Sequence, residues 1–567
     1  MADNKKETER TELHRTIWSI ANDLRGSVDG WDFKQYVLGM LFYRYISENL
    51  DKYITKGEIE AGNTDFSYAK LSDEEALGTK DDIVKEKGFF ILPSQLFCNV
   101  LEKANKDNAD LNEKLENIFK DIENTALGTD SEDDFKGLFA DIDVNSNKLG
   151  ATVGKRNDML VKLMNGIASM NLGNGDYSDN SIDAFGDAYE YLMGMYASNA
   201  GKSGGEYYTP QEVSELLTKI TLVNGDGSMK KSVNKVYDPA CGSGSLLLKF
   251  AKILGSDNVR QGFFGQEINI TTYNLCRINM FLHDVSYDKF SIKLGDTLIE
   301  PKHWDDEPFE AIVSNPPYSI KWEGDDNPIL INDPRFSPAG VLAPKGKADL
   351  AFIMHSLSWL ATNGTAAIVC FPGIMYRGGA EQKIRKYLVD NNYIDCIIQL
   401  PDNLFFGTSI ATCIMVLKKG KAESKTLFID ASKECVKVTN SNKLTDENIE
   451  NILKIFSERK EKIDYVSRLV NNDEIAGNEY NLSVSSYVEA EDTREAIDIK
   501  VLNAQIAEIV EKENFLRAEI DKIIGEIDAS ATLSNHDSTP LGNRASTSSA
   551  TDEQPRNVVI ERSRNDK

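Results

Sequence analysis

The chain has 567 residues, of which 41% are hydrophobic and 27% charged, and its formal net charge is −26. This composition is typical of a soluble protein with about two to four domains, and the longest apolar runs are too short to span a membrane. Seven scattered cysteines without C-x-x-C spacing favour neither a disulfide framework nor a zinc site. Because the first residues also lack the apolar segment of a secretory signal, we expect a cytoplasmic protein with free thiols.

The acidic charge bears on nucleic-acid binding. A chain that binds DNA by itself needs a basic surface, because neutralising phosphates supplies most of the affinity. No long block of Lys and Arg occurs in this sequence. Either the chain does not contact nucleic acid, or another subunit supplies the positive surface.

Residues 1–170 predict a helical domain. The segment FKQYVLGMLFYRYISENL has helical spacing of apolar residues and a high density of aromatic ones, which favours packing against a substantial surface. A stretch rich in Gly, Asn and Asp at 171–181 predicts a loop that ends this region. The aromatic residues concerned are Phe33, Tyr36, Phe42, Tyr43 and Tyr45.

Residues 171–488 predict an α/β domain with a seven-stranded, mostly parallel Rossmann-like sheet. Helical stretches separate the first six strand candidates, which is the rhythm of a doubly wound sheet. The short segment 401–410 joins the last two, and this predicts an antiparallel hairpin at one edge. The strand candidates are 234–238, 262–266, 290–296, 310–315, 365–371, 394–400 and 411–419.

Residues 489–527 predict a long, coiled-coil-like helix that docks on a partner. Apolar residues recur there at spacings of three and four, with Glu513 as one interruption. The following segment, 528–567, lacks an apolar pattern and is predicted to be disordered. The apolar seam consists of Ile499, Leu502, Ile506, Ile509, Leu516, Ile520, Ile523 and Ile527.

A glycine-rich turn follows the first predicted strand of the sheet. The sequence DPACGSGS supplies an acid, Asp238, and then a turn before an apolar helix, an arrangement that lets backbone approach a ligand. The third glycine of a dinucleotide fingerprint is missing, so that interpretation is weak. The turn residues are Gly242, Ser243, Gly244 and Ser245.

The next two predicted strands also end in acids. Glu267 can accept hydrogen bonds from ribose hydroxyls, and Asp296 can accept one from an adenine amino group. Each acid alone could be a helix N-cap, which is the better explanation of any single Asp. Together with Asp238 they predict a nucleoside pocket.

The fourth predicted strand breaks into Asn315, Pro316, Pro317 and Tyr318. Two consecutive prolines cannot continue a sheet ladder, because each lacks an N–H and has a fixed φ. The sequence therefore predicts a stiff turn that presents an amide and an aromatic ring where open α/β sheets bind ligands.

In this order, DPACGSGS, GQEIN, GDTL and NPPY resemble the S-adenosylmethionine-dependent DNA methyltransferases that modify adenine N6. The resemblance is closer still to the modification subunits of type I restriction–modification systems. It runs from 18–47, through GGEYYTPQEV within 185–213, to the C-terminal helix. NPPY alone is shared with protein-glutamine methyltransferases, whereas GGEYYTP is much more specific.

The resemblance implies S-adenosylmethionine as the cofactor. It implies that Asp238 and the glycine turn hold the methionine part, that Glu267 binds the ribose, and that Asp296 lies near the adenine. The segment before the first strand should fold over the cofactor, although Thr209 and Pro210 also predict a helix start. That segment consists of Glu206, Tyr207, Tyr208, Thr209, Pro210 and Gln211.

The resemblance also assigns catalysis to the NPPY turn. Asn315 and the Pro316 carbonyl would accept N6–H bonds and direct the nitrogen lone pair at the methyl group, while Tyr318 stacks on a base flipped out of the duplex. The Pro/Gly-rich segment 319–350 is interpreted as a mobile flap that orders over DNA.

Type I organisation implies DNA, a specificity subunit bound by the C-terminal helix, and a restriction subunit as partners. It implies two modification subunits per specificity subunit, and it would explain the acidic charge, since the specificity subunit reads the DNA. Two alternatives stay open: a protein-glutamine N5 methyltransferase that uses the same NPPY chemistry, and a non-catalytic cofactor-binding scaffold.

Overall fold

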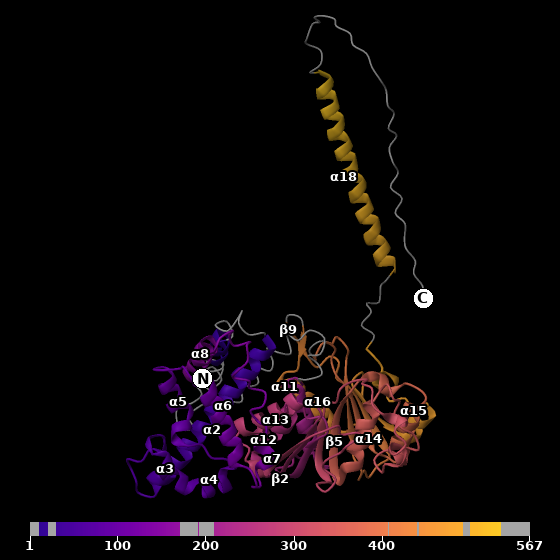
Figure 1. Ribbon diagram of the computed structural model, residues 1–567. Coiled ribbons are helices and arrows are strands. Elements are labelled where there is room, and N and C mark those ends of the chain that lie inside the picture. The colour runs from indigo at the N-terminus through magenta and orange to yellow at the C-terminus, as the bar shows by residue number, and fades with distance from the viewer. Residues whose placement is uncertain are drawn as a thin grey trace, which may run out of the picture. The chain divides into compact units, whose positions relative to one another are not determined.

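The computed structural model divides the chain into two compact units, residues 1–490 and 491–567 (Figure 1). The first unit contains a mixed sheet with helices around it, and the second contains one long helix. Among the described helices, none is long and apolar enough to cross a membrane. The structure describes residues 11–20, 30–170, 191, 209–405, 408–438, 441–491 and 499–533.

A ten-stranded sheet forms the centre of the first unit, with the order β11-β12-β8-β6-β7-β5-β4-β1-β2-β3. The strands β3, β2, β1, β4 and β5 run parallel to one another. A separate two-stranded sheet pairs β9 with β10. The strands are β1 (Val233–Asp238), β2 (Val259–Glu267), β3 (Phe290–Leu294), β4 (Phe309–Ser314), β5 (Leu360–Cys370), β6 (Ile394–Gln399), β7 (Cys413–Leu417), β8 (Lys425–Asp430), β9 (Val436–Val438), β10 (Ser441–Lys443), β11 (Lys462–Ile463) and β12 (Ser467–Asn471).

The predicted hairpin of β6 and β7 is antiparallel, but its place at an edge of the sheet is wrong. β7 inserts between β5 and β6 and is antiparallel to both. β8 then pairs parallel with β6, and β12 and β11 extend the sheet further. The sheet therefore has ten strands rather than seven. The extra strands were missed because short apolar runs such as the one at 426–429 do not distinguish strand from other buried segments by periodicity.

Helices cover both faces of this sheet. One face, together with α11, α12, α13, α16 and the N-terminal helices, forms the larger hydrophobic cluster. The opposite face packs against α14, α15 and the segment between β4 and α14. The helices are α2 (Gly30–Glu60), α3 (Asp73–Ala76), α4 (Lys80–Lys87), α5 (Phe97–Ala104), α6 (Leu111–Thr125), α7 (Glu132–Phe135), α8 (Val153–Ser169), α11 (Gln211–Leu222), α12 (Ser245–Leu254), α13 (Ile270–Leu282), α14 (Asp349–Trp359), α15 (Ala380–Asp390), α16 (Asp446–Glu458), α17 (Asn472–Gly477) and α18 (Ile499–Leu533).

The aromatic helix predicted near the N-terminus is α2, and its partner is the sheet domain. Phe42 lies with its ring 5.6 Å from that of Phe139 and 6.0 Å from that of Phe281 in α13. Phe135 lies 4.9 Å from the same Phe281 ring. Aromatic packing thus joins the helical region to the sheet. Tyr36, Phe42, Tyr43 and Tyr45 are buried, whereas the side chain of Phe33 lies outside the described residues.

The C-terminal helix, α18, begins later and ends later than predicted. It spans Ile499–Leu533, so residues 528–533 of the predicted tail are helical. All the residues of the predicted apolar seam are exposed. The remainder of the tail, from 534 onward, lies outside the described residues.

Candidate active site

The site is expected where the order of the strands reverses. From β1 the chain passes to β2 and β3 on one side and to β4 and β5 on the other. β1 and β4 lie side by side, with Tyr237 in register with Ile312. Parallel sheets bind ligands outside the carboxyl ends of two such strands. Asp238 at the end of β1 and Asn315 just after β4 are therefore placed at this crevice.

Asp238 is completely buried. Its Oδ1 accepts the Ala240 N–H at 3.0 Å, and its Oδ2 makes no hydrogen bond within the part of the chain that the structure describes. Burial raises the pKa of this carboxyl to about 7, because a charge is costly away from water. The side chain of Ser314 lowers this pKa and is thus a neighbour of the carboxyl. A buried acid at this edge is suited to a cationic or hydrogen-donating group.

The glycine turn brings backbone close to the end of β2. Gly242 and Gly244 have φ of 54° and 80°, values that favour glycine. A Cβ on Gly244 would lie 2.7 Å from the Cys276 sulfur, so the space admits no side chain. The Gly242 N–H donates to Glu267 Oε2 at 3.0 Å, which joins the turn to the second predicted acid. Ser243 and Ser245 complete the turn, and α12 begins at Ser245.

The acids after β2 and β3 are not helix caps. Glu267 Oε1 accepts the Asn269 N–H at 2.9 Å, while Asn269 itself caps α13. Burial raises the pKa of Glu267. Asp296 Oδ1 accepts the Leu298 N–H at 2.9 Å. The alternative of N-capping is thus wrong for both. Glu267 ends β2, which pairs with β1, and Asp296 follows β3, which pairs with β2.

The amide of Asn315 is oriented by two neighbours. Its Nδ2 donates to the Thr209 hydroxyl at 3.1 Å, and its Oδ1 accepts from the Tyr318 hydroxyl at 2.6 Å. Burial raises the pKa of Tyr318 well above its ordinary value, so the phenol keeps the proton that it donates. The two bonds hold the plane of the amide, with its oxygen toward Tyr318 and its nitrogen toward Thr209. The sequence predicted Tyr318 only as a stacking surface, and its bond to Asn315 was missed.

A carboxylate anchors the NPPY turn from behind. Pro316 is buried and Pro317 half-buried. Ser319 has a φ of +52°, and its N–H donates to both carboxylate oxygens of Asp349 at 3.1 Å. Asp349 begins α14 and was not predicted as a site residue. An acid that opens a helix is an ordinary sequence feature, and nothing in the sequence joins it to a turn 30 residues earlier.

The segment before α11 is only partly described. The predicted N-cap, Thr209, is wrong: Pro210 is the N-cap and α11 begins at Gln211. The Thr209 hydroxyl is buried and serves Asn315 instead. Gln211 Nε2 is buried without a hydrogen bond to any described residue. Glu206, Tyr207 and Tyr208 lie outside the described residues.

The segment 319–350 is folded onto the sheet domain rather than standing free. Trp322, Leu330 and Phe336 are buried in the second hydrophobic cluster. The Trp322 backbone N–H donates to the Lys345 carbonyl at 3.0 Å, and its indole N–H donates to the Pro344 carbonyl at 3.2 Å. Three large apolar side chains thus anchor to the sheet domain the segment that the sequence predicts to be a mobile flap over DNA.

Comparisons with known proteins agree with this arrangement. Residues 180–496 match the family model described as N-6 DNA Methylase, and residues 13–167 match the HsdM N-terminal domain. The chain is 51% identical, over 92% of its length and 98% of the relative's, to the type I restriction enzyme MpnII methylase subunit of Mycoplasma pneumoniae. It is 30% identical, over 92% of its length and 85% of the relative's, to the MjaVII methylase subunit of Methanocaldococcus jannaschii.

A solved structure of a related subunit also matches this chain. The type I restriction–modification system methyltransferase subunit from Streptococcus thermophilus superposes with a TM-score of 0.75 at 37% identity. The match covers 85% of this chain and 100% of that one.

A mixed sheet with acids at the ends of adjacent strands, preceded by a helical domain, defines a methyltransferase-like fold, and the chain belongs to the N-6 DNA methylase family. Within that family it is the modification subunit of a type I restriction–modification system, an adenine-specific DNA methyltransferase. The function predicted from the sequence is confirmed, and the protein-glutamine alternative is set aside.

Proposed function

We propose that the chain transfers the methyl group of S-adenosylmethionine to N6 of an adenine flipped out of a specific DNA sequence, which a separate specificity subunit reads. The observation that carries this proposal is the oriented amide of Asn315 at the switch point of the sheet. Its acceptor oxygen lies on a stiff turn next to the end of β1, where Asp238 is buried.

The residues present fit the cofactor. Asp238 Oδ2 and Gln211 Nε2 are buried polar atoms without hydrogen bonds among the described residues, and a ligand with amino and carboxylate groups would satisfy both. Asp238 and the 242–245 turn would hold the methionine part, Glu267 the ribose and Asp296 the adenine amino group. Residues 206–211 would cover the ligand. When bound, S-adenosylmethionine supplies a methyl group on a positively charged sulfur.

The chain's own groups prepare the nucleophile. Adenine N6 is a weak nucleophile, since its lone pair is delocalised into the ring. Asn315 Oδ1 and the Pro316 carbonyl would accept the two N6–H bonds and hold the amino group with its lone pair aimed at the cofactor. Thr209 opposes rotation of the Asn315 amide, and the prolines leave little to reorganise at the moment of reaction.

Tyr318 would serve the target base in two ways. Its ring offers a stacking surface worth about 1–3 kcal/mol per base, which offsets part of the cost of flipping. Its hydroxyl uses one lone pair of Asn315 Oδ1 and leaves the other for the base. Hydrogen-bond acceptors that position the amino group are sufficient without a strong general base, because N6 becomes acidic only as the methyl group is transferred.

The assembly follows from charge and from α18. A chain of net charge −26 needs a basic partner to hold DNA, and the exposed apolar seam of α18 offers that partner a helix to bind. We propose two modification subunits per specificity subunit, with a restriction subunit in the full complex, acting in the cytoplasm. The proposed domains are 1–170, 171–488 with β3-β2-β1-β4-β5-β7-β6 as its methyltransferase sheet, 489–527 for docking, and the tail 528–567.

The test measures transfer of label from radiolabelled S-adenosylmethionine to DNA, with and without the specificity subunit. We expect N6-methyladenine only with the partner, and its loss in Asn315→Ala. Asn391→Ala is the matched control, since the side chain of this exposed asparagine donates to the Tyr387 carbonyl on α15. Label on DNA without a partner would contradict the proposed division of labour, and retained activity in Asn315→Ala would remove the assigned role of the amide.

A further inference from the structure

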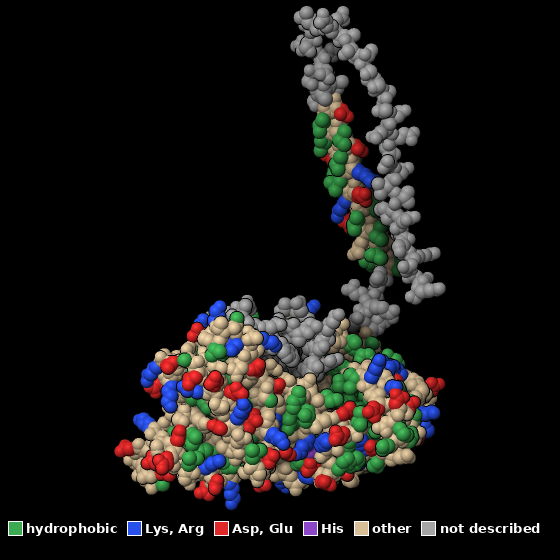
Figure 2. Space-filling model, viewed as in Figure 1, with side chains coloured by type: hydrophobic (Ala, Val, Ile, Leu, Met, Phe, Trp, Pro, Cys, Tyr) green, Lys and Arg blue, Asp and Glu red, His purple; other side chains and the backbone are tan. Residues whose placement is uncertain are grey.

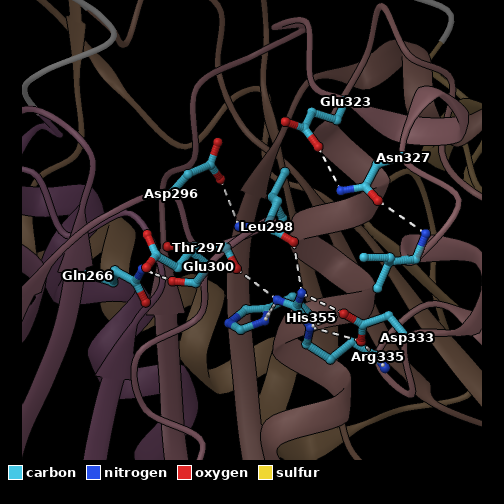
Figure 3. A network of polar contacts seen from close by, with 11 residues as sticks. Gln266, Asp296, Thr297, Leu298, Glu300, Glu323, Asn327, Asp333, Arg335 and His355 are labelled. Carbon is cyan, nitrogen blue, oxygen red and sulfur yellow. Dashed lines mark hydrogen bonds and ion pairs between the residues drawn. The ribbon is translucent and has the colours of Figure 1, made fainter.

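A buried arginine contacts the backbone that follows β3, next to Asp296. Arg335 is 1% exposed, and all five of its N–H groups have acceptors (Figure 3). The nearest bonds run from Nη1 to the Thr297 carbonyl and from Nη2 to the Leu298 carbonyl, each at 2.7 Å. The other acceptors are Asp333 Oδ1 and Oδ2 at 2.8–3.2 Å and His355 Nδ1 at 3.1 Å.

The partner histidine is held in one neutral form. Arg335 can only donate, so His355 Nδ1 must accept, and the ring proton then lies on Nε2. Nε2 lies 3.0 Å from the hydroxyl of Tyr237, the residue before Asp238. Burial and the neighbouring guanidinium keep the pKa of His355 well below its ordinary value, which preserves the neutral form.

The backbone that Arg335 binds is the backbone that aims Asp296. The Leu298 N–H donates to Asp296 Oδ1 at 2.9 Å, while the Leu298 carbonyl accepts from Arg335. Figure 3 shows Asp296 joined to Leu298 and Leu298 joined in turn to the guanidinium. The Thr297 hydroxyl adds a bond to the Pro239 carbonyl at 2.6 Å. The backbone of Thr297 and Leu298 is therefore held in place, and Arg335 supplies the charged donors to their carbonyls.

We infer that Arg335 is a positioning residue that sets the Asp296 carboxylate to accept from the amino group of the cofactor's adenine. The inference rests on the proposed function, in which Asp296 binds that amino group. Arg335 comes from the segment between the NPPY turn and α14, so the loop that follows the catalytic turn also shapes the cofactor site. Lysine cannot reproduce this arrangement, because its single ammonium lacks the planar fork that reaches two carbonyls and a carboxylate together.

The test compares two ligands on the full-length chain by isothermal titration calorimetry. S-adenosylhomocysteine carries the adenine amino group, and S-inosylhomocysteine has a carbonyl in its place. For Arg335→Lys we expect binding of S-adenosylhomocysteine to weaken about tenfold, the effect of one misaligned charged hydrogen bond. Binding of S-inosylhomocysteine should hardly change, so the variant loses discrimination. The KM for S-adenosylmethionine should rise while kcat at saturation is nearly retained.

Arg385→Lys is the matched control. Arg385, on α15, is also 1% exposed and donates to two backbone carbonyls, those of Tyr480 and Ile374. We expect it to lower the melting temperature as Arg335→Lys does without changing the ratio of the two affinities. If both variants lost the preference for S-adenosylhomocysteine over S-inosylhomocysteine equally, the inference would be overturned, since the loss would then be a general effect of destabilisation. If Arg335→Lys does not fold, Asp333→Asn loosens the same guanidinium and takes its place.

Asp296→Asn separates this inference from the proposed function. If Asp296→Asn keeps the wild-type ratio of affinities, the assignment of Asp296 to the adenine is wrong. If it loses the ratio and Arg335→Lys does not, only the role of Arg335 is wrong. In the double variant that combines Asp296→Asn with Arg335→Lys, the second change should not lower the ratio of the two affinities further, because both residues act through one carboxylate. Additive losses would show that Arg335 acts elsewhere.

Discussion

The helices α2 and α18 have similar lengths and opposite surroundings. α2 has 31 residues and α18 has 35, and both carry a run of apolar side chains. In α2, Val37 and Leu41 are fully buried, whereas in α18 the exposed fractions of Ile509 and Leu516 are 63% and 61%. Hydrophobic side chains along α18 are visible in Figure 2.

The burial of α2 and the exposure of α18 point to two different tasks, building the site and binding a partner. α2 packs on the sheet domain within the first unit, through Phe42 and Phe281, and helps to build one folded body around the site. A fully buried Ile or Leu contributes about 1.5–3 kcal/mol, and α18 leaves this contribution unused in the described chain. In the function proposed above, methyl transfer depends on groups inside the first unit, whereas assembly depends on the exposed apolar side chains of α18.

The largest effect is expected on assembly. Ile509→Asp with Leu516→Asp places two charges in the docking seam, and loss of two buried side chains of about 1.5–3 kcal/mol each weakens binding of the specificity subunit by about 10²–10⁴-fold. DNA methylation should fall with it, while binding of S-adenosylhomocysteine is retained. Co-purification and calorimetry measure both. Glu519→Gln, also on α18, is the control and should leave the complex intact. If the double variant bound the specificity subunit with normal affinity, the proposed docking role of α18 would be wrong.

A loss of nearly similar size is expected at the centre of the site. Asn315→Ala removes an oriented acceptor, and loss of one preorganised hydrogen-bonding group typically lowers kcat by about 10²–10³-fold. Assembly and cofactor binding should be unchanged, which is the reverse of the α18 result. Single-turnover methylation by the assembled complex measures the effect. If Asn315→Ala also disrupted assembly, the separation of the two regions would fail.

The pH dependence of cofactor binding should follow Asp238. Its pKa is raised to about 7 by burial, so the carboxyl becomes neutral as the pH falls through that value. Binding of the ligand's ammonium group requires the ionised form, and the affinity should therefore drop about tenfold between pH 8 and pH 6. Titration of S-adenosylhomocysteine across this range checks the sign. Asp238→Asn should bind weakly at both pH values and show a flat profile; a wild-type affinity that rises on acidification would contradict the assignment.

The smallest effect is expected at Thr209. Thr209→Val removes the acceptor for the Asn315 amide while keeping the shape of the side chain, and loss of one neutral hydrogen bond of about 1 kcal/mol lowers kcat about fivefold. Thr209→Ser keeps the hydroxyl and should restore most of the rate. The measurement is kcat at saturating cofactor. A larger fall in cofactor affinity than in kcat would place Thr209 on the cofactor rather than on the amide.

The strands that carry the site were predictable because each is a strong local pattern. β1 to β4 end in an acid or in NPPY, and their apolar runs are bounded by Gly or Pro. β8, β11 and β12 were missed, since β8 and β12 pair with strands distant in the sequence and no acid or glycine turn marks their ends as a site. The Rossmann-like centre was therefore predicted, while the extension of the sheet beyond β6 was not.

The sequence by itself determined where the candidate groups lie: Asp238, Glu267, Asp296 and Asn315 each stand at or just after the end of a strand, and local spacing is sufficient to predict that. Only the tertiary structure decided how these groups are oriented. Asp349 holds the turn of Ser319 and Arg335 holds the backbone after Asp296, both across the fold. Contacts between residues far apart in the chain leave no period or motif in the sequence, because they depend on how the sheet and its helices pack.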